Sequence, residues 1–438
     1  MEQKDFTVAI VGGGIAGLAC AIGLAQAGVR VDVFESVSQY GANVGGGLNL
    51  GPNAVRVLRC MGVLDKITVP SQGNHAPPRP NTYVMGEEPH TLVYEYPFPE
   101  EPGMTIHRAT LVNTLASILP DGVASHLSKR CTAITRNITS NGKHTRLHFA
   151  DGTVHDADAI IGADGIKSVV RTHIFGQEDG HLVDTGGRAY RSQLAIQELL
   201  EAGFKEETLQ TPQLWIDKDK HLVTYPIMNG TILNVVAFPL DYSHSMIPVG
   251  QSQASWSTWV VKVPQEEMLE AFSNYGSIPR AILKRIKEPS RWSIHALYPP
   301  LESYVGAAKM EGKDDHEVNV ALIGDAAHAM LPFLGAGAGA GIEDAYVLAR
   351  LLAHPQTSRA NLSHVLRAYD SIRTPRGAHA ANASRRTGEV MHGRGPSGPS
   401  ESGRRKDIQS QWENIWDVDV KVDVEKAVDG LVKSGIFV

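Results

Sequence analysis

Residues 12–17 have the sequence Gly-Gly-Gly-Ile-Ala-Gly, and Glu35 follows 18 residues after the last glycine. These residue types at this spacing can bind a dinucleotide. Gly12 allows a tight turn, Gly14 lets the backbone approach a pyrophosphate, and Gly17 lets a helix pack closely on a strand. The unpaired amides at the start of that helix attract phosphates, and the Glu35 carboxylate can accept a hydrogen bond from a ribose hydroxyl.

Two strands and a helix must position these residues. The apolar run Thr7 to Val11 predicts the first strand, the Ala- and Leu-rich stretch after Gly14 predicts the helix, and Val29 to Phe34 predicts the second strand. The stretch from Thr7 to Val29 carries no charge and is long enough to span a bilayer. Its six glycines and the downstream ribose acid favour a buried strand and helix, and we expect no stable membrane insertion.

The composition limits the possible partners. With 438 residues, 42% of them hydrophobic and 20% charged, the chain is expected to form two interleaved globular domains. A net charge of -6 argues against a nucleic-acid surface and favours small-molecule ligands. The three cysteines, Cys20, Cys60 and Cys131, lack metal-ligand spacing and are interpreted as reduced thiols of a cytoplasmic protein.

Two further strand-to-turn motifs occur later in the chain. The sequence GADGIKSVVR at 162–171 follows the predicted strand Ala157 to Ala163, and GDAAHAMLPFLGAGAGAGIEDA at 324–345 follows the predicted strand Val318 to Ile323. Between them, His221 to Ile227 and Ile232 to Phe238 predict an antiparallel hairpin turning at Asn229-Gly230. Helices are predicted at Gln265 to Asn274, Pro279 to Lys287, Ile342 to Leu352 and Leu362 to Arg373, and a mobile surface loop at Gly393 to Arg405.

These three motifs, in this order, resemble those of the class A flavoprotein monooxygenases, which have the p-hydroxybenzoate hydroxylase fold, and most closely its fungal salicylate hydroxylase-like branch. The resemblance extends over nearly the whole chain and includes Gly51-Pro52-Asn53 and Tyr190-Arg191. It implies an α/β fold, with an FAD-binding Rossmann-like domain of the glutathione reductase type, an inserted antiparallel-sheet substrate domain and C-terminal helices. The expected boundaries are 1–80, 105–187 and 297–375 for the FAD-binding domain, 81–104 and 188–296 for the substrate domain, and 376–438 for the C-terminal helical segment.

The resemblance also implies cofactor contacts beyond Gly12, Gly14, Gly17 and Glu35. Asp325 would bind the ribityl chain of FAD, although a helix N-cap is the alternative. Arg108 would face the FAD phosphates, with an ordinary surface salt bridge as the alternative. Asp164 would touch both FAD and the pyridine nucleotide. Gly47, in a glycine-rich loop, and the helix start at Gly335, Gly337 and Ala338 would lie against the flavin ring.

The implied reaction uses NAD(P)H to reduce FAD. Dioxygen then forms a flavin C4a-hydroperoxide that hydroxylates a small aromatic substrate, phenolic or salicylate-like, in fungal secondary metabolism. Arg191 and Tyr225 would be the catalytic residues that orient a phenolate, and core packing is the alternative for Tyr225. Phe333-Leu334 stands where many salicylate-type relatives carry a His, which removes a possible proton acceptor and leaves an alkene or indole acceptor as an alternative. The alternative of another class is a non-catalytic flavin-binding protein.

Other polar residues have simpler interpretations. His328 is interpreted as structural, His221 as a strand cap, and Glu343 and Asp344 as packing and ion-pair residues. His144 and His148 lie four apart in a predicted strand, too far separated to share one ion, so no metal is expected. The choice between NADH and NADPH, and between monomer and homodimer, stays open.

Overall fold

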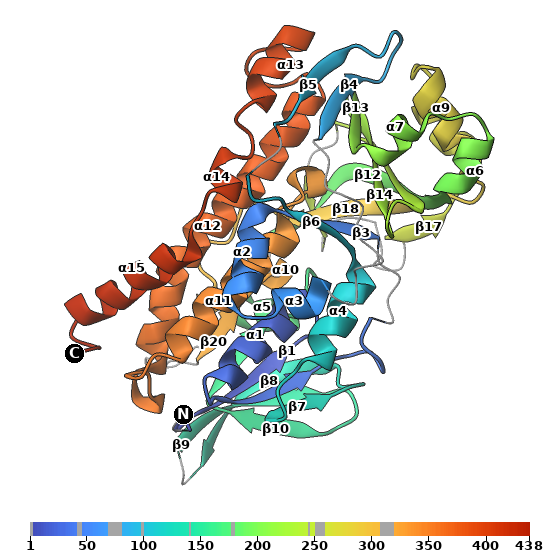
Figure 1. Ribbon diagram of the computed structural model, residues 1–438. Helices are drawn as coiled ribbons and strands as arrows, with labels where there is room; N and C mark the ends of the chain where they lie inside the picture. Colours follow the sequence, from blue (N-terminus) through green and yellow to red (C-terminus); the bar gives the residue numbers. More distant parts are fainter. Residues whose placement is uncertain are drawn as a thin grey trace.

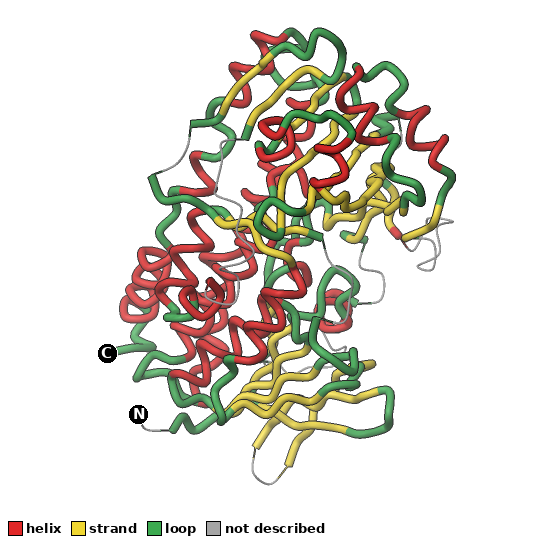
Figure 2. The backbone as a smooth tube through the Cα atoms, turned by 45° about the vertical axis from the view of Figure 1, so that its right-hand side comes forward, coloured by secondary structure: helices red, strands yellow, loops and turns green. Residues whose placement is uncertain are grey.

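The computed structural model describes residues 3–41, 46–68, 81–97, 100–139, 142–176, 180–243, 246–249, 259–306 and 319–438. The two halves of the molecule each contain a large sheet, and helices run along one side of both (Figure 1). Figure 2 shows the two groups of strands separated by the middle of the molecule. The Pro-rich segment from Pro70 to Pro80 and the segment from Lys309 to Glu317 lie outside the described residues.

The first sheet has six strands in the order β19-β20-β11-β1-β2-β7. Its central strands are parallel, with Ile10 opposite both Ile161 and Val33. Their residues are almost wholly apolar because helices or other strands cover both faces. The strands are β1 (Thr7–Val11), β2 (Arg30–Phe34), β7 (Val123–His126), β11 (Ala159–Gly162), β19 (Val305–Gly306) and β20 (Val320–Leu322).

Helices α1 (Ile15–Gln26) and α11 (Gly337–Leu352) pack against each other beside this sheet. A Cβ on Gly23 would lie 2.8 Å from the Cβ of Ala349, so a small residue is needed at this contact. Helix α11 starts five residues before the predicted Ile342. Its glycines serve helix packing as well as the turn, because a Cβ on Gly341 would lie 3.2 Å from Ala16 Cβ.

Other elements complete this half. The antiparallel strands β8 (Cys131–Thr139), β9 (Gly142–Phe149) and β10 (Val154–Ala157) form a separate sheet, and β3 (Gly47–Leu50) pairs with β6 (Met104–His107). The predicted strand Ala157 to Ala163 is present as β11, whereas Ala157 itself ends β10. The helices here are α2 (Pro52–Cys60), α3 (Leu64–Thr68), α4 (Arg108–Ser117), α5 (Val169–Phe175) and α10 (Asp325–His328), with the 3₁₀ helices η3 (Pro332–Leu334) and η4 (Arg359–Asn361).

The second sheet follows the order β17-β18-β12-β15-β14-β13-β4-β5, with β16 paired to β12. All pairs are antiparallel except β13 with β4. The predicted hairpin is present, with Ile227 opposite Ile232. The strands are β4 (Thr82–Met85), β5 (Leu92–Glu95), β12 (Leu182–Ala195), β13 (Gln213–Asp217), β14 (Lys220–Ile227), β15 (Ile232–Pro239), β16 (Ile247–Pro248), β17 (Val260–Lys262) and β18 (Ser290–Leu297). The helices are α6 (Ile196–Glu201), α7 (Glu206–Gln210), α8 (Gln265–Ala271) and α9 (Ser277–Leu283).

Helix α12 (Leu362–Met391) is one 30-residue helix running between the two halves, where the sequence predicted an end at Arg373. Pro375 lies inside it and removes one hydrogen bond. Buried residues on both sides of the proline, including Arg373, Gly377 and Ser384, hold the helix together by packing. The expected domain boundary at 375/376 therefore falls within α12, as the one at 187/188 falls within β12.

The segment from Gly393 to Arg405, predicted as a mobile surface loop, is fixed to the protein core. Arg404 is buried and donates hydrogen bonds to the carbonyl oxygens of Met391, Asp217 and Pro399. The prediction of a mobile loop is wrong because it relied on the Gly, Ser and Pro content of this segment, which is typical of loops. Helix α13 (Glu401–Ile408) begins within the segment. Helices α14 (Glu413–Trp416) and α15 (Val420–Lys433) complete the chain.

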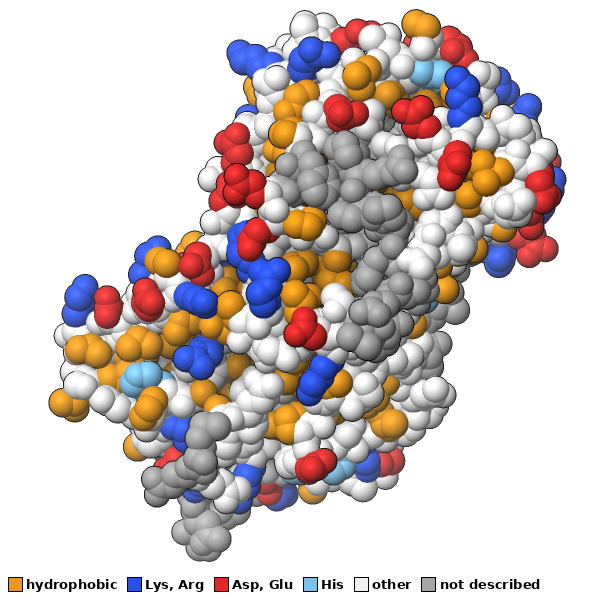
Figure 3. All heavy atoms as spheres, viewed as in Figure 1, with side chains coloured by type: hydrophobic (Ala, Val, Ile, Leu, Met, Phe, Trp, Pro, Cys, Tyr) orange, Lys and Arg blue, Asp and Glu red, His pale blue; other side chains and the backbone are white. Residues whose placement is uncertain are grey.

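The exposed charges are mixed in sign. On the face shown in Figure 3, Lys and Arg are interspersed with Asp and Glu among the described residues, and hydrophobic side chains are visible at the middle of the molecule. No helix within the described ranges is long and apolar enough to cross a membrane. Within the same ranges, no group of three or more His, Cys, Asp or Glu side chains could hold a metal ion.

Candidate active site

The turn between β1 and α1 leaves open space in front of Gly14. Gly12 has φ 109°, a conformation that favours glycine. A Cβ on Gly17 would lie 2.0 Å from the carbonyl oxygen of Gly12, so the helix packs directly on the turn. A Cβ on Gly14 would meet no atom of the part of the chain that the structure describes within 4 Å. The space in front of Gly14 is thus open, and the first amides of α1 have no partners within the helix.

Glu35 closes this opening at the end of β2. Its Oε2 accepts a hydrogen bond from the Gly13 amide at 2.8 Å, and its Oε1 accepts one from the Val37 amide at 3.0 Å. These bonds hold the carboxylate beside the glycine turn, where a ribose would follow a pyrophosphate.

A second helix start faces a cavity of about 630 Å³, within the size range of small-molecule sites. Gly335, Gly337 and Ala338 line this cavity, and Gly335 has φ 64°. Asp325, at the start of α10, also lines it and is exposed while Ala326 to Ala329 are buried. The Asp325 carboxylate makes no hydrogen bond or ion pair with the described part of the chain. A Cβ on Gly337 would lie 3.9 Å from its Oδ1, so carboxylate and helix start adjoin.

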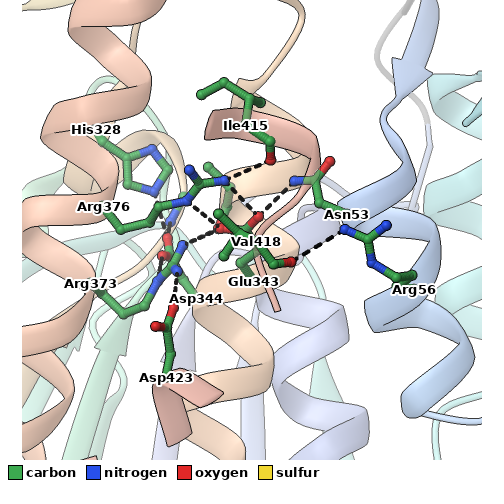
Figure 4. Close-up of polar contacts among 12 residues, drawn as sticks. Asn53, Arg56, His328, Glu343, Asp344, Arg373, Arg376, Ile415, Val418 and Asp423 are labelled. Atoms are coloured by element: carbon green, nitrogen blue, oxygen red, sulfur yellow. Dashed lines mark hydrogen bonds and ion pairs between the residues drawn. The ribbon is translucent and has the colours of Figure 1, made fainter. Parts of the chain in front are cut away.

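A buried ion network holds the start of α11 in place (Figure 4). Arg373 donates from Nε to Asp344 at 2.8 Å and from Nη2 to Glu343 at 2.9 Å. Glu343 also accepts hydrogen bonds from Arg376 and from Asn53 of α2. The prediction that Glu343 and Asp344 form ion pairs is confirmed.

His328 belongs to this network and not to the cavity lining. It lies 2.5 Å from Asp344 and is buried. Burial opposes protonation of His328, but the charge of Asp344 and the hydrogen bond to it raise the pKa of the imidazole above its ordinary value. Burial would raise the pKa of Asp344, yet His328 and Arg373 lower it to about 2. These pairs tie α10, α11 and α12 together beneath Asp325.

The other wall of the cavity is one face of the nine-stranded sheet. His221, Val223 and Tyr225 alternate along β14 and point to the cavity, since side chains two apart in a strand share a face. Val236 and Phe238 of β15 lie opposite Val223 and His221 on the same face. His221 is therefore an internal strand residue with a fully buried ring, and the prediction that it caps a strand is wrong.

Arg191 of β12 reaches the same cavity. Its guanidinium lies 5.2 Å from the centre of the Trp292 ring and makes no hydrogen bond or ion pair with any residue that the structure describes. The side chain is exposed because it faces the cavity. Burial in the surrounding protein lowers the pKa of Arg191, partly offset by Tyr225. Arg191 and Tyr225 therefore line the same cavity, and their role in orienting a phenolate stays a prediction.

Tyr225 lies at the cavity wall, but its hydroxyl group points to the backbone of another strand, β3. It donates a hydrogen bond to the Gly47 carbonyl at 2.9 Å, which joins the sheet to β3. Burial raises the pKa of Tyr225 to about 12, against the opposing effects of Arg191 and Asn234. The hydroxyl proton of Tyr225 is therefore bonded to the Gly47 carbonyl. This differs from the sequence analysis, which expects the hydroxyl to orient a phenolate.

Asp164 and Arg108 are also predicted to contact the cofactors, and their surroundings differ from each other. The Asp164 carboxylate accepts hydrogen bonds from Ser168 Oγ and from the amides of Val169 and Val170, so it caps the start of α5. Arg108 is half-buried at the start of α4, and its guanidinium has no partner within the described ranges.

The sequence analysis missed aromatic residues from the C-terminal segment. Trp412 and Trp416 line the cavity, and their rings stack with centres 4.4 Å apart. Tyr96 meets both rings edge-on. The spacing of four between the tryptophans would have predicted one helical face, but not which cavity that face borders.

Comparisons with known proteins agree with this geometry. A family model described as FAD binding domain matches residues 5–384. A salicylate hydroxylase of Pseudomonas putida is 35% identical over 97% of this chain and 95% of its own length. The 6-methylsalicylate 1-monooxygenase atA of Aspergillus terreus is 32% identical over 86% of this chain and 81% of its own. A solved salicylate hydroxylase substrate complex matches with a TM-score of 0.83, 32% identity, and coverage of 97% of this chain and 98% of that one.

The chain belongs to the class A flavoprotein monooxygenases. It is an FAD-dependent monooxygenase, and NAD(P)H is the co-substrate typical of this family. The open space before Gly14, the free Asp325 carboxylate and the two unpaired helix starts fit FAD. In a member of this family, Gly14 and Glu35 would hold the pyrophosphate and ribose, Asp325 the ribityl chain, and the α11 start the flavin ring.

The expected contact of Asp325 with the ribityl chain of FAD predicts a measurable loss of affinity when Asp325 is replaced. Replacing Asp325 by alanine should weaken FAD binding by about 10- to 100-fold, because a hydrogen bond to a charged group contributes about 1.5–3 kcal/mol. The substitution removes no hydrogen bond within the described residues, so the thermal stability of the apoprotein should stay close to that of the wild type. Flavin fluorescence titration measures the affinity, and Asp121→Ala at an exposed turn is the control. Wild-type affinity in Asp325→Ala would contradict the ribityl assignment.

Proposed function

We propose that this monooxygenase hydroxylates a small aromatic substrate, phenolic or salicylate-like, that binds as an anion. The observation that carries the proposal is the unpaired Arg191 guanidinium on the apolar face of the cavity. The salicylate hydroxylase and 6-methylsalicylate 1-monooxygenase relatives support the same substrate class.

Arg191 supplies a cation beside a mostly apolar wall. Val223, Val236 and Phe238 form the surrounding wall, and Phe333 with Leu334 lie beside the α11 start. In such surroundings a carboxylate or phenolate gains charge-assisted hydrogen bonds that are stronger than those in water. Bound FAD, reduced by NAD(P)H, supplies the activation of dioxygen. The residues of the chain orient the ring, exclude water and hold its negative charge.

Tyr225 serves this site as a positioning residue. Its ring forms part of the wall and its hydroxyl fixes Gly47, so the sheet that carries Arg191 is held against the backbone of β3. A Cβ on Gly47 would lie 2.9 Å from the Tyr225 ring, so this approach requires glycine.

A substrate panel tests the proposed function. The purified FAD-loaded protein is mixed with NADH or NADPH and with salicylate, 6-methylsalicylate, phenol or indole, and products are identified by mass. We expect hydroxylated product from the aromatic acids, with catechol and carbon dioxide from salicylate if the ring carbon bearing the carboxylate is attacked. Product from indole alone would contradict the anionic substrate.

Replacing Arg191 by methionine should lower kcat/KM for salicylate by about 10²- to 10³-fold, the scale of one preorganised donor. Methionine keeps apolar volume but removes the charge. FAD content should stay unchanged, and NAD(P)H should be consumed without product because the ring is no longer oriented. Arg188→Met is the matched control, since Arg188 lies on the same strand and pairs with Asp184 outside the cavity lining. Wild-type hydroxylation by Arg191→Met would contradict the assignment of Arg191 as the residue that binds the substrate anion.

Phe333 and Leu334 favour the second candidate, an FAD-dependent epoxidase or hydroxylase acting on an alkene or indole. Both are buried apolar residues at the cavity. The same substrate panel distinguishes the two candidate functions. The second candidate predicts that indole is turned over and that Arg191→Met retains this activity.

The setting of the reaction is also part of the proposal. We propose that the enzyme acts in the cytoplasm, as a monomer or homodimer, with dioxygen as co-substrate, in fungal secondary metabolism. The fungal monooxygenase relatives and the reduced cysteines support this setting. Size-exclusion chromatography with light scattering decides the oligomeric state.

A further inference from the structure

Four side chains form a row across one face of the nine-stranded sheet. Arg191 of β12 lies opposite Val236 of β15. Val236 also lies opposite Val223 of β14, which in turn lies opposite Leu214 of β13. All four side chains line the cavity. Neighbouring strands are about 4.8 Å apart, so the row extends about 14 Å from Arg191 to Leu214. The row therefore begins with a cation and continues with three aliphatic side chains, which we call the apolar row.

The side chains on either side of the apolar row are in contact with other parts of the chain. On one side, the Phe333 ring packs edge-on against His221 and Phe238, with ring centres 5.2 and 5.5 Å apart. On the other side, the Tyr225 hydroxyl donates a hydrogen bond to the Gly47 carbonyl at 2.9 Å. Within the described ranges, these contacts leave the apolar row as the floor of a groove between Phe333 and Gly47.

Aromatic side chains lie at the far end of the apolar row. Leu214 is paired with Tyr83 of the next strand, β4, and both belong to the same hydrophobic cluster as Tyr96 and Trp412. Tyr96 and Trp412 line the cavity, and their rings meet edge-on with centres 6.3 Å apart. The Tyr96 hydroxyl already donates a hydrogen bond to the Gln409 carbonyl. This end of the cavity therefore presents ring carbons to a ligand.

We infer that the substrate is an aromatic anion that carries an apolar chain of several carbons, and that this chain lies along the apolar row. The inference rests on the proposed function, because Arg191 must first hold the anionic group. A salicylate bound at Arg191 does not reach Leu214, since one ring with its carboxylate is much shorter than the row. A chain at the ring position opposite the carboxylate would cover Val223 and Leu214 and end near Trp412.

The chemistry of the floor determines the kind of chain. The side chains of Val236, Val223 and Leu214 have no atom that can form a hydrogen bond. A hydroxyl or carboxylate placed over them would lose its water without gaining a partner. A methylene placed there leaves water for an apolar surface, which strengthens binding by about 3- to 4-fold for each carbon. The apolar row therefore favours an alkyl chain over a polar one.

A series of salicylates tests the inference. The FAD-loaded enzyme, without NAD(P)H, is titrated with salicylate and with its 4-methyl, 4-propyl, 4-pentyl and 4-heptyl derivatives. The change in flavin absorbance gives each dissociation constant. We expect the dissociation constant to fall by about 3-fold for each added carbon and to level off once the chain has passed Leu214. The matched control ligand is 4-(4-carboxybutyl)salicylate, which has the length of the pentyl compound but ends in a charge. It should bind no more tightly than salicylate.

The variant Leu214→Gln tests the position of the chain. Glutamine is similar in size to leucine but places an amide where the chain would end, so 4-pentylsalicylate should bind about 10-fold more weakly than in the wild type. The FAD content and the dissociation constant for salicylate should stay close to those of the wild type, because salicylate does not reach this position. Leu92→Gln is the matched control, since Leu92 lies on β5 of the same sheet but is 49% exposed and outside the cavity lining.

The outcomes separate this inference from the proposed function. Equal dissociation constants for all the alkyl derivatives, in an enzyme that hydroxylates salicylate, would overturn the apolar chain and leave the proposed function standing. The same dependence on chain length in Leu214→Gln and in the wild type would overturn the assignment of the chain to the apolar row. If Leu214→Gln does not fold, the ligand series in the wild type decides alone. A wild-type enzyme that binds neither salicylate nor any derivative would overturn both proposals.

Discussion

Replacing Gly14 by valine is expected to give a folded protein that no longer retains FAD. The backbone of Gly14 is extended, with φ -78° and ψ -172°, so a side chain causes no strain there. A Cβ would meet no atom of the described residues within 4 Å, so folding should be unaffected. The branched side chain would instead occupy the space in front of the first amides of α1. Overpacking of about 3 kcal/mol against the pyrophosphate lowers affinity by about 100-fold.

The experiment measures the FAD-to-protein ratio by absorbance after gel filtration, and folding by circular dichroism. Gly122→Val is the matched control, since a Cβ on Gly122 also meets nothing within 4 Å but lies at the turn before β7. Wild type and control should carry close to one FAD per chain, and Gly14→Val almost none. Full flavin occupancy in Gly14→Val would contradict binding of the FAD pyrophosphate in front of Gly14.

Replacing Arg373 by methionine is expected to lower the free energy of unfolding by about 3–5 kcal/mol, the range for breaking a buried ion pair. Arg373 is fully buried between Glu343 and Asp344, and methionine would leave both carboxylates with fewer partners. Urea unfolding followed by fluorescence measures the loss. Arg385→Met on the same helix is the control, because its pair with Glu389 is half-exposed and should contribute at most about 1 kcal/mol.

The same variant should also be more sensitive to acid. The pKa of Asp344 is depressed in the folded protein, so its contribution to stability is present above its unfolded value of 3.8 and is lost as the pH falls toward 2. Without Arg373 the depression is smaller, and the stability contributed by Asp344 at neutral pH is smaller as well. Acid unfolding of Arg373→Met should therefore begin at a higher pH than in the wild type. An unchanged acid midpoint would contradict the network as a source of stability.

The glycine motifs and strand patterns were sufficient to predict the fold class and the family. Gly12 to Gly17, Glu35 and the sequence from Gly324 to Asp344 are local signals, because each acts through backbone geometry within one turn. The unpaired Arg191 could be assigned only through family resemblance. Among the described residues it makes no ion pair, and this depends on which side chains the folded sheet brings near it, which its own sequence context does not encode.

The errors have a common physical origin in tertiary packing. The path of α12 through Pro375, the buried Arg404 and the internal position of His221 all depend on segments distant in sequence. Trp412 could not be recognised as a site residue for the same reason, since the chain reaches the cavity there only after α12 crosses the molecule. Tyr225 was placed correctly at the wall, but the partner of its hydroxyl, Gly47, lies 178 residues away.

The continuity of α12 has a thermodynamic consequence. A 30-residue helix is about 45 Å long, and this one is bonded to α11 through Arg373 and carries His392 to the nine-stranded sheet at its end. Neither sheet can lose its structure without disturbing the same helix, which favours a single cooperative unfolding transition. Ligand at 100 times its Kd stabilises a native state by about 2.7 kcal/mol. FAD bound at the first sheet would therefore also protect the distant sheet that holds the substrate, so that loss of flavin in the cell exposes the whole chain to proteolysis and not one domain alone.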